Sequence, residues 1–415
     1  MKGKYGLIGQ HLSHSLSPGI HKLFCDYEYK LYPMEKEEVP RFLGNKNFDG
    51  INVTIPYKLE AAKYCDHISR EVEKIGSVNT IKVMPDKSLR GFNTDYYGFL
   101  YLLKRNGFVI KGKKCLVLGS GGASLTVTTV LTDLGALETV VISRNGADNY
   151  ENISKHYDAQ VIINTTPVGM YPNNLECLIE LDCFKNCDTV VDLIYNPVRT
   201  KLLLDAKRLN IAHDNGLAML VAQAKQACEI FTGKKIDEHK IEDGIKEIKK
   251  SITNIVLVGM PGVGKTTLSK LLAERLHREV IDTDKQIEEK QATDIETIFK
   301  EHGEKFFRAL ETTEVKEAGK RLSVIISTGG GVVKSDDNYA PLSQNGVIVF
   351  LNSDPDRLDM RGRPLSKDRE TLRKMYLERF PLYQSFCDVQ VEVDRNPEIT
   401  LARLLEVLNN ENFCY

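Results

Sequence analysis

One stretch constrains the fold of this chain more than any other. The apolar run Asn254–Val258 is followed at once by Gly259-Met260-Pro261-Gly262-Val263-Gly264-Lys265-Thr266-Thr267. This is a complete G-x-x-x-x-G-K-[ST] phosphate-binding loop in its required setting, with a strand-forming run before it and a helix-forming run after it. Its glycines let backbone N–H groups converge on phosphate oxygens, while Lys265 reaches the β- and γ-phosphates and Thr266 offers a hydroxyl to Mg²⁺. The sequence therefore predicts an ATP-type nucleotide site in a parallel α/β fold. The nucleotide-binding positions expected here are Gly262, Val263, Gly264, Lys265, Thr266 and Thr267.

A second glycine-rich loop, of a different kind, follows the apolar run Lys114–Leu118. It carries the first two glycines of a G-x-G-x-x-G dinucleotide loop, but Ser124 replaces the third. No carboxylate follows the next strand, where NAD-specific folds place one for the ribose 2′-hydroxyl; Arg144 stands there instead. A guanidinium suits a 2′-phosphate, so the loop favours NADP(H) over NAD(H), with a surface arginine on a turn as the alternative. The expected cofactor-binding residues are Gly119, Ser120, Gly121, Gly122, Ala123, Ser124 and Arg144.

Short apolar runs alternate with longer amphipathic stretches along the whole chain, as in βαβ units with parallel strands. The strands predicted in the first part are 5–8, 50–54, 114–118, 139–142, 161–164 and 189–193. A second series is predicted at 254–258, 279–282, 324–327 and 347–351. Between the two series, Lys234–Lys250 has 11 charged residues of 17, with isoleucines at helical spacing. It is either a terminal helix or a solvated connector, and a boundary is expected near residues 245–252.

Composition excludes several classes of protein. The 415 residues, with 56 basic and 57 acidic side chains, are enough for two to three domains and give a net charge of −1. The near-equal numbers of basic and acidic side chains argue against nucleic-acid binding, which needs an excess of basic residues on the surface. No apolar run has the roughly 18–20 residues of a membrane span. The N-terminal run lacks the apolar core of a signal peptide, and the nine scattered cysteines are expected to be reduced thiols without metal-site spacing. We therefore expect a cytoplasmic protein that acts on small molecules.

Polar clusters stand in the first part of the chain at the ends of predicted strands. They are His14-Ser15-Leu16-Ser17-Pro18, Asn52-Val53-Thr54-Ile55-Pro56-Tyr57-Lys58, Gly76-Ser77-Val78-Asn79-Thr80 and Gly91-Phe92-Asn93-Thr94-Asp95. Each cluster alone is explained by turn formation, because Asn, Asp, Ser and Gly favour turns.

Together these clusters resemble the shikimate dehydrogenase family, and the resemblance covers residues 5 to about 232. Further matching stretches are Asn164–Met170, Asp192–Tyr195 and Asn215–Gln223. The resemblance implies that Lys58 and Asp95 are the catalytic pair and that Leu193 and Gly216 join the cofactor contacts. The substrate-binding residues it implies are Ser15, Ser17, Thr54, Asn79, Tyr195 and Gln223.

This assignment makes chemical sense, because reduction of a ketone needs a proton for the developing alkoxide and Lys58, held by Asp95, can give it. Two departures from the family pattern stand out. Gln10-His11-Leu12 replaces the usual Asn-Pro pairing after Gly9, and Ser143-Arg144-Asn145 replaces the usual Asn-Arg-Thr. The second departure keeps Arg144 and leaves the strictness of NADP preference open.

Residues 252–415 resemble shikimate kinase, which has a P-loop nucleoside-monophosphate-kinase-like fold. The matching stretches are the phosphate loop, Ile281–Asp284, Gly303–Arg308, Ser327–Gly331, Arg361–Leu365 and Arg379–Tyr383. The resemblance implies that Asp284, Arg308, Gly330 and Arg379 bind shikimate, with Asp284 catalytic. It places Arg363 in a lid over ATP, Arg395 near the nucleotide base, and Thr266 with Asp282 at Mg²⁺. Phosphoryl transfer depends on positioning and charge neutralisation, which such cations and a metal supply.

The sequence thus predicts a fused α/β enzyme of the shikimate pathway, which leads to chorismate and the aromatic amino acids. Its steps would be NADPH-dependent reduction of 3-dehydroshikimate to shikimate and MgATP-dependent phosphorylation of the shikimate 3-hydroxyl. The expected domains are a substrate-binding domain at 1–100 with helices of 215–245 packing back, a Rossmann domain at 101–214, a linker at 246–251 and a kinase domain at 252–415. The alternatives are a catalytically degenerate metabolite sensor and a quinate/shikimate dehydrogenase that uses NAD. Oligomeric state is left open.

Overall fold

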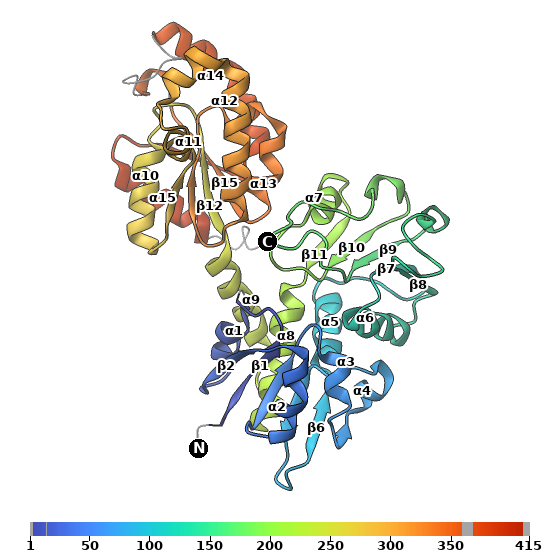
Figure 1. Ribbon diagram of the computed structural model, residues 1–415. Helices are drawn as coiled ribbons and strands as arrows, with labels where there is room; N and C mark the ends of the chain where they lie inside the picture. The colour runs from blue at the N-terminus through green and yellow to red at the C-terminus, as the bar shows by residue number, and fades with distance from the viewer. Residues whose placement is uncertain (1–2, 14, 359–367, 410–415) are drawn as a thin grey trace. The chain divides into compact units, whose positions relative to one another are not determined.

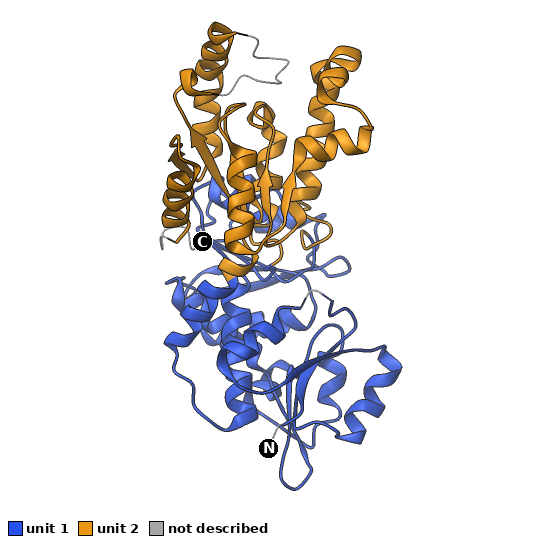
Figure 2. Ribbon diagram, turned by 90° about the vertical axis from the view of Figure 1, so that its left-hand side faces the viewer, with its two compact units in different colours: residues 1–168, 177–195, 202–248 blue, residues 169–176, 196–201, 249–415 orange. Residues whose placement is uncertain are grey.

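The computed structural model describes residues 3–13, 15–358 and 368–409 and divides the chain into two compact units (Figures 1 and 2). Unit 1 comprises residues 1–168, 177–195 and 202–248. Unit 2 comprises residues 169–176, 196–201 and 249–415.

The first sheet of unit 1 is mixed. Among the described residues it has the strand order β2-β1-β3-β5-β6-β4. β1 runs parallel to β2 and β3, whereas β5 is antiparallel to both β3 and β6. The expectation of parallel strands is wrong for β5 and β6, because a tight turn joins them, with Met84 N–H donating to Ser88 O at 2.9 Å. Such a turn reverses the chain, while parallel neighbours need a longer crossover. The strands are β1 (Tyr5–Gly9), β2 (Tyr29–Pro33), β3 (Gly50–Val53), β4 (His67–Ile68), β5 (Thr80–Val83) and β6 (Leu89–Phe92).

Helices pack around this sheet, and its core is apolar. Ile8, Leu43, Ile51, Ile81 and Leu89 are at most 1% exposed. The helices are α1 (Ser17–Phe24), α2 (Val39–Asn45), α3 (Lys58–Ala62), α4 (Arg70–Ile75) and α5 (Thr94–Arg105), with a 3₁₀ turn at Lys36–Glu38. α3 and α5 begin directly at polar stretches that follow strands, so their first residues lie at strand ends.

The second sheet of unit 1 is parallel throughout its described strands, in the order β11-β10-β9-β7-β8. β7 has β8 on one side and β9 on the other, which makes its carboxyl end the switch point where such sheets bind ligands. The strands are β7 (Lys114–Leu118), β8 (Glu138–Ile142), β9 (Val161–Asn164), β10 (Thr189–Asp192) and β11 (Ala212–Asn215). The helices are α6 (Gly122–Asp133) and α7 (Lys201–Arg208), with 3₁₀ turns at Ile153–His156 and Leu181–Cys183.

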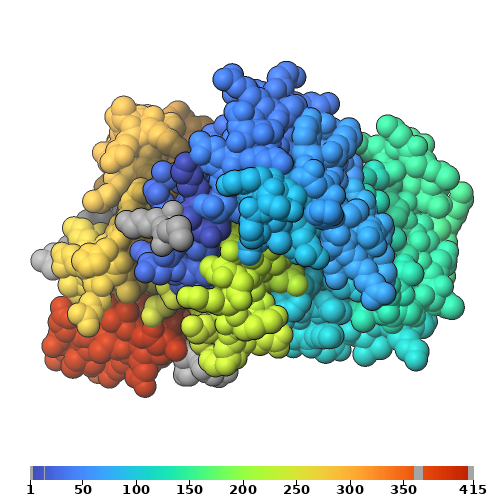
Figure 3. Space-filling model, turned by 90° about the horizontal axis from the view of Figure 1, so that it is seen from below, coloured from blue at the N-terminus to red at the C-terminus, as the bar shows by residue number. Residues whose placement is uncertain are grey.

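After β11 the chain returns to the first sheet of unit 1. α8 (Leu217–Thr232) packs against α5 and α1, and α9 (His239–Ile252) follows it. Tyr97 Oη donates to Glu238 at 2.9 Å and Tyr101 Oη to Glu242 at 2.7 Å, so the start of α9 lies on α5. In Figure 3 the yellow-green surface of α8 and the start of α9 adjoins the cyan surface of the region around residue 100, which includes α5. The charged segment 234–250 is therefore largely helical, with Ile241, Ile245 and Ile248 buried, and the solvated-connector alternative is wrong.

Unit 2 contains a parallel sheet with the order β13-β14-β12-β15-β16 among its described strands. The strands are β12 (Asn254–Val258), β13 (Val280–Asp282), β14 (Ile325–Ser327), β15 (Gly346–Asn352) and β16 (Val389–Glu392). The helices are α10 (Lys265–Leu276), α11 (Thr283–Gln291), α12 (Ile295–Lys320), α13 (Tyr339–Ser343), α14 (Arg369–Phe386) and α15 (Pro397–Asn409), with 3₁₀ turns at Val332–Lys334, Asp336–Asn338 and Pro355–Arg357. Gly303, at φ 81°, interrupts α12 with a kink.

All ten predicted strands are present, with bounds that differ by at most one residue at either end. The predicted α/β fold class is confirmed by these parallel sheets. Within the described part of the chain, every helix is too short or too polar to cross a membrane.

Candidate active sites

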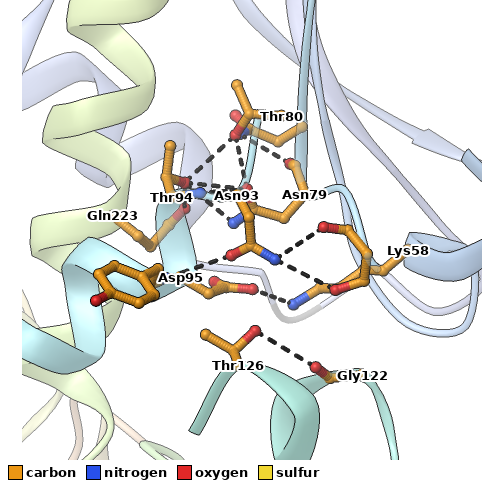
Figure 4. A network of polar contacts seen from close by, with 12 residues as sticks. Lys58, Asn79, Thr80, Asn93, Thr94, Asp95, Gly122, Thr126 and Gln223 are labelled. Atoms are coloured by element: carbon orange, nitrogen blue, oxygen red, sulfur yellow. Dashed lines mark hydrogen bonds and ion pairs between the residues drawn. The ribbon is translucent and has the colours of Figure 1, made fainter. Parts of the chain in front are cut away.

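A lysine–carboxylate pair lies beyond the carboxyl ends of β3 and β6 in the first sheet of unit 1 (Figure 4). Lys58 Nζ is 2.6 Å from Asp95 Oδ2, and the two side chains are 16% and 11% exposed. Lys58 begins α3 just after β3, while Asp95 lies in the first turn of α5 just after β6. A Cβ built on Gly122 would lie 3.8 Å from Lys58 Cδ, so the lysine stem passes beside the N-terminus of α6. A partly exposed ammonium held by a carboxylate can donate a proton to an oxygen bound beside it.

Buried amides fix the helix that carries Asp95. Asn93 caps α5 by accepting from Tyr96 N–H at 3.3 Å, and its own amide donates to Ser77 O at 3.0 Å. Asn79 is 3% exposed and accepts from Thr94 N–H at 2.7 Å. Two of these bonds satisfy otherwise unpaired N–H groups at the start of α5, and the third ties its cap residue to Ser77. The protein therefore holds the position of the Asp95 carboxylate before any ligand arrives.

Asn79 and Gln223 lie near the Lys58–Asp95 pair, and both form hydrogen bonds with other side chains of the protein (Figure 4). Asn79 Nδ2 donates to Thr94 Oγ1 at 3.0 Å. Thr94 Oγ1 donates in turn to Gln223 Oε1 at 3.2 Å, which links α5 to α8. Thr94, which stands in one of the polar clusters but has no role predicted from the sequence, is therefore the residue that joins two expected substrate-binding side chains.

The other expected substrate residues lie near strand ends of unit 1. Ser15 accepts from Ser17 N–H at 3.3 Å just before α1. Thr54 follows β3 and its N–H donates to Ile8 O at 2.9 Å, beside the end of β1. Tyr195 follows β10, and burial raises the pKa of its hydroxyl. His14 lies outside the described residues.

The dinucleotide loop occupies the switch point of the second sheet. Gly119 follows β7 with φ 105°, a conformation that favours glycine, and a Cβ there would lie 2.8 Å from Thr166 Cγ2. Gly121 precedes α6, and a Cβ built on it would have no other atom within 4 Å. The backbone at Gly121 is therefore accessible to a bulky group such as a pyrophosphate. The backbone N–H groups at this helix start give an anion-binding position. The expected residues Gly119, Ser120, Gly121, Gly122, Ala123 and Ser124 form this loop, with Ser124 buried.

Two further predicted cofactor positions lie at neighbouring strand ends. Arg144 is exposed just after β8, the strand beside β7. Leu193 and Gly216 contact each other directly, since a Cβ on Gly216 would lie 2.0 Å from Leu193 O. A side chain at position 216 would therefore displace backbone at the end of β10.

The phosphate loop of unit 2 joins β12 to α10. Lys265 is 8% exposed, and its Nζ donates to Gly259 O at 2.8 Å and Met260 O at 3.1 Å. Thr266 Oγ1 donates to Asp282 Oδ2 at 3.3 Å. A hydroxyl and a carboxylate at this spacing fit a Mg²⁺ that takes its remaining ligands from phosphate and water. Within the described ranges, no cluster of three or more His, Cys, Asp or Glu side chains could hold a metal alone.

Beside this loop, two carboxylates share a buried space. A Cβ on Gly329 would lie 2.6 Å from Asp284 Oδ1 and 2.8 Å from Glu311 Oε1, so both oxygens approach the same glycine. Each of these oxygens is buried without a hydrogen-bond partner among the described residues. Burial and the Glu311 charge raise the pKa of Asp284 to about 7. Burial also raises the pKa of Glu311, which is 0% exposed.

Two arginines converge on the same space. Arg308 donates from Nη1 to Glu311 Oε2 at 2.8 Å, and a Cβ on Gly331 would collide with its guanidinium. Arg379, 6% exposed on α14, donates to Gly330 O at 2.9 Å. The predicted residues Asp284, Arg308, Gly330 and Arg379 thus lie together around the stretch Gly329–Gly331.

Glu311 was missed by sequence reasoning, although it holds Arg308 and acts on Asp284. The available signal was the spacing of Arg308 and Glu311 on one helix, where residues three apart are neighbours. That signal is weak, because Glu residues in a charged helix are usually exposed.

A cavity of about 310 Å³ adjoins the phosphate loop. Gly262, Val263, Gly264, Thr267 and Arg395 all contribute to its lining, which brings these predicted nucleotide-binding residues together. Leu351 and Leu358 give it apolar walls, as a nucleotide base requires. Arg363 lies outside the described residues.

Two family models match separate parts of the chain. The shikimate dehydrogenase substrate binding domain matches residues 7–81, and shikimate kinase matches residues 261–409.

Individual similar proteins each cover about 60% of the chain. A shikimate dehydrogenase (NADP(+)) of Clostridium beijerinckii is 42% identical over 59% of this chain and 97% of its own length. The crystal structure of a chorismate mutase/shikimate 5-dehydrogenase fusion protein from Clostridium acetobutylicum is 38% identical, with a TM-score of 0.57 over 60% of this chain and 98% of that one. A shikimate 5-dehydrogenase from Thermus thermophilus, solved with NADP(H) and shikimate, is 31% identical, with a TM-score of 0.53 over 58% and 97% of the two chains.

Proposed function

Because this chain belongs to the shikimate dehydrogenase family and also carries a shikimate kinase domain, we propose that it is an enzyme with two active sites. One site would reduce 3-dehydroshikimate to shikimate with NADPH, and the other would phosphorylate the 3-hydroxyl of shikimate with MgATP. The observation that carries the proposal is that each of the two nucleotide loops has its own cluster of charged side chains beside it. Lys58 and Asp95 lie near the dinucleotide loop, and Asp284, Arg308 and Arg379 lie near the phosphate loop.

In the reductive site, NADPH supplies the hydride when it is bound. Lys58 places its ammonium on the substrate oxygen that becomes negative, stabilises that charge and gives it a proton. Asp95 fixes the direction of the lysine side chain through the 2.6 Å ion pair. Hydroxyl and amide groups of Ser15, Ser17 and Gln223 then suit a polyhydroxylated ring with a carboxylate.

In the phosphorylating site, MgATP supplies the phosphoryl group when it is bound. Lys265 neutralises phosphate charge, and Thr266 and Asp282 would hold the metal. Asp284 accepts the proton of the attacking hydroxyl, while Arg308 and Arg379 bind the substrate carboxylate through charge-assisted bonds. Arg395 would lie beside the nucleotide base in the 310 Å³ cavity.

We infer a corresponding division of the chain. Residues 1–100, with the returning helices of 215–245, would bind the dehydrogenase substrate, and residues 101–214 would bind NADP(H). Residues 252–415 would form the kinase, with 246–251 as the connection. The return of α8 onto α5 supports the first of these assignments.

Two other functions are less well supported. A metabolite sensor that has lost catalysis would keep its binding residues and lose the residues that carry out the reactions. In this chain the residues proposed to act in the reactions are all present: Lys58, Asp95, Lys265, Asp282 and Asp284. An NAD-dependent quinate/shikimate dehydrogenase is disfavoured by Arg144, which suits a 2′-phosphate.

Separate assays test the two halves. NADPH consumption with 3-dehydroshikimate, followed by its near-ultraviolet absorbance, is expected in the absence of ATP. Formation of a phosphorylated product from shikimate and MgATP is expected in the absence of NADPH. If neither nucleotide were consumed while both still bound, the sensor would be the better account.

Replacing Arg144 with alanine is expected to weaken use of NADPH selectively. Charge-assisted hydrogen bonds to a phosphate contribute about 1.5–3 kcal/mol, so the KM for NADPH should rise roughly ten- to a hundredfold. The KM for NADH should stay unchanged because NADH has no 2′-phosphate. Steady-state kinetics with both cofactors measure this, and Lys155→Ala, at an exposed lysine of the same unit, is the control. Equal effects on both cofactors would contradict the role given to Arg144.

The kinase reaction is expected to depend on the ionisation of Asp284. Its pKa is raised to about 7, and a proton acceptor must be ionised, so kcat/KM for shikimate should fall about tenfold per pH unit below that value. Glu311→Gln removes a negative charge that raises the pKa of Asp284. The acid limb of the pH profile, which is the fall of kcat/KM at low pH, should therefore move to lower pH. Glu311→Gln can also lower the rate, because Arg308 loses its ion pair with Glu311. The pH at which the profile falls measures the change in the pKa of Asp284 independently of that loss of rate.

Glu314→Gln is the matched control for that experiment. Glu314 is a buried carboxylate on the same helix, but it pairs with Lys290 at 2.7 Å. Its replacement should leave the acid limb in place. An unmoved limb in Glu311→Gln would show that Glu311 does not act on the titrating group.

A further inference from the structure

Two cysteines far apart in the sequence lie in one cluster of unit 1. Cys25 directly follows α1, where its N–H donates to His21 O at 2.9 Å. Cys228 lies on α8 and is 0% exposed, whereas Cys25 is only partly buried. α1 packs against α8, and both cysteines contact His21 of α1: the histidine carbonyl accepts from Cys25 N–H, and its ring Nδ1 lies 3.3 Å from Cys228 Sγ. The pair therefore has one thiol that solvent can reach and one that it cannot.

Polar contacts hold the buried thiol in place. Cys228 Sγ lies 3.1 Å from Tyr27 Oη and 3.3 Å from His21 Nδ1. Tyr27 Oη and His21 Nδ1 are themselves 2.7 Å apart, and the His21 ring stacks on Tyr29 at 3.9 Å between centroids. Two polar groups, Tyr27 Oη and His21 Nδ1, thus contact the Cys228 sulfur beside stacked aromatic rings.

The partly exposed thiol has the features of a reactive cysteine. A hydrogen bond from Cys228 lowers the pKa of Cys25, as do a hydrogen bond from Tyr27 and the charges of Lys234 and Lys240, while desolvation opposes them. Burial raises the pKa of Cys228. A thiol pKa lowered from its ordinary value, access to solvent and a neighbouring thiol are the combination found in cysteines that are oxidised reversibly.

We propose that Cys25 and Cys228 form a reversible oxidation site whose oxidant is hydrogen peroxide. The Cys25 thiolate attacks one peroxide oxygen, which breaks the O–O bond, forms a sulfenic acid and releases hydroxide. Cys228 then attacks the Cys25 sulfur, and the S–O bond breaks as the S–S bond forms. The thiol proton of Cys228 leaves with the departing oxygen, so one peroxide and two thiols give one disulfide and two waters. A dithiol reverses the reaction by exchange.

Cys25 is the C-cap residue of α1, with extended backbone angles of φ −143° and ψ 145°. The connection from Cys25 to β2 is irregular, so no helix or strand follows it directly. The disulfide would join the end of α1, which begins at Ser17, to α8, which carries Gln223. Oxidation would therefore link two elements of the proposed substrate pocket and leave the nucleotide loops untouched.

Mass spectrometry of the full chain tests the proposal without relying on enzyme activity. The protein is treated with hydrogen peroxide, alkylated and digested without reductant. The expected product is a linked pair of peptides containing Cys25 and Cys228, which dithiothreitol separates. In Cys228→Ser the sulfenic acid at Cys25 has no thiol to attack it, so dimedone should label Cys25.

Cys65 is the internal control, because it is also partly buried but its pKa is raised to about 12 by burial. Before oxidation, iodoacetamide near neutral pH should modify Cys25 at least about tenfold faster than Cys65, since the thiolate is the nucleophile. Absence of the linked peptides in peroxide-treated wild-type protein would overturn the proposal, as would equal alkylation of Cys25 and Cys65. Both measurements use the wild-type chain, so they hold even if a variant fails to fold.

Discussion

Replacing Lys58 with alanine is expected to lower the rate of 3-dehydroshikimate reduction by roughly 10²–10³, the usual effect of removing one group that stabilises transition-state charge. The variant loses the ammonium that lies 2.6 Å from Asp95 and would protonate the new alkoxide. The kinase rate should be unchanged because its charged groups belong to a separate cluster. Steady-state NADPH oxidation and shikimate phosphorylation, measured on the same preparation, give the two rates.

Lys63→Ala is the matched control for Lys58→Ala. Lys63 follows the same short helix, is exposed, and pairs with Glu60 at 2.7 Å instead of with Asp95. Its removal should leave reduction within about twofold of wild type, since isolated surface ion pairs contribute little. A Lys58→Ala enzyme that still reduces its substrate at the wild-type rate would remove Lys58 from the mechanism.

The reverse result is expected for Lys265→Ala. Lys265 is the lysine of the phosphate loop, and its loss should lower the phosphorylation rate by roughly 10²–10³ because phosphoryl transfer depends on charge neutralisation. Reduction of 3-dehydroshikimate should continue at the wild-type rate. A coupled assay for ADP and the NADPH assay measure the two reactions.

Lys270→Ala, at an exposed position on the same helix, controls for general effects on α10. The two lysine variants together test whether the sites act independently. If either substitution abolished both activities in folded, soluble protein, the model of two independent sites would be wrong.

Much of the architecture follows from local patterns in the sequence. The phosphate loop requires a strand before it and a helix after it, and β12 and α10 provide them. The parallel strands appear in the sequence as short, nearly continuous apolar runs, so they can be recognised without knowledge of the tertiary structure. The sequence of residues 234–250 does not decide between a helix and a connector, because its many charges favour solvent. Burial of Ile241, Ile245 and Ile248 decides in favour of the helix.

The electrostatics of the sites do not follow from local patterns. Lys58 and Asp95 are 37 residues apart, and only the resemblance to a family predicts that they meet. The raised pKa of Asp284 depends on burial and on Glu311, a residue from a different helix. Such effects arise from distances between elements, which periodicity does not encode. For the same reason the sequence reasoning missed the bonds of Thr94 to Asn79 and Gln223.

The central claim is that one polypeptide turns a ketone into a phosphate ester through a shared intermediate. The most direct test is product analysis of a single reaction that contains the purified chain, 3-dehydroshikimate, NADPH and MgATP. The expected result is shikimate 3-phosphate, with one NADPH oxidised per molecule formed, and shikimate itself when ATP is omitted. Unchanged 3-dehydroshikimate, or shikimate that accumulates unphosphorylated although MgATP is present, would contradict the claim.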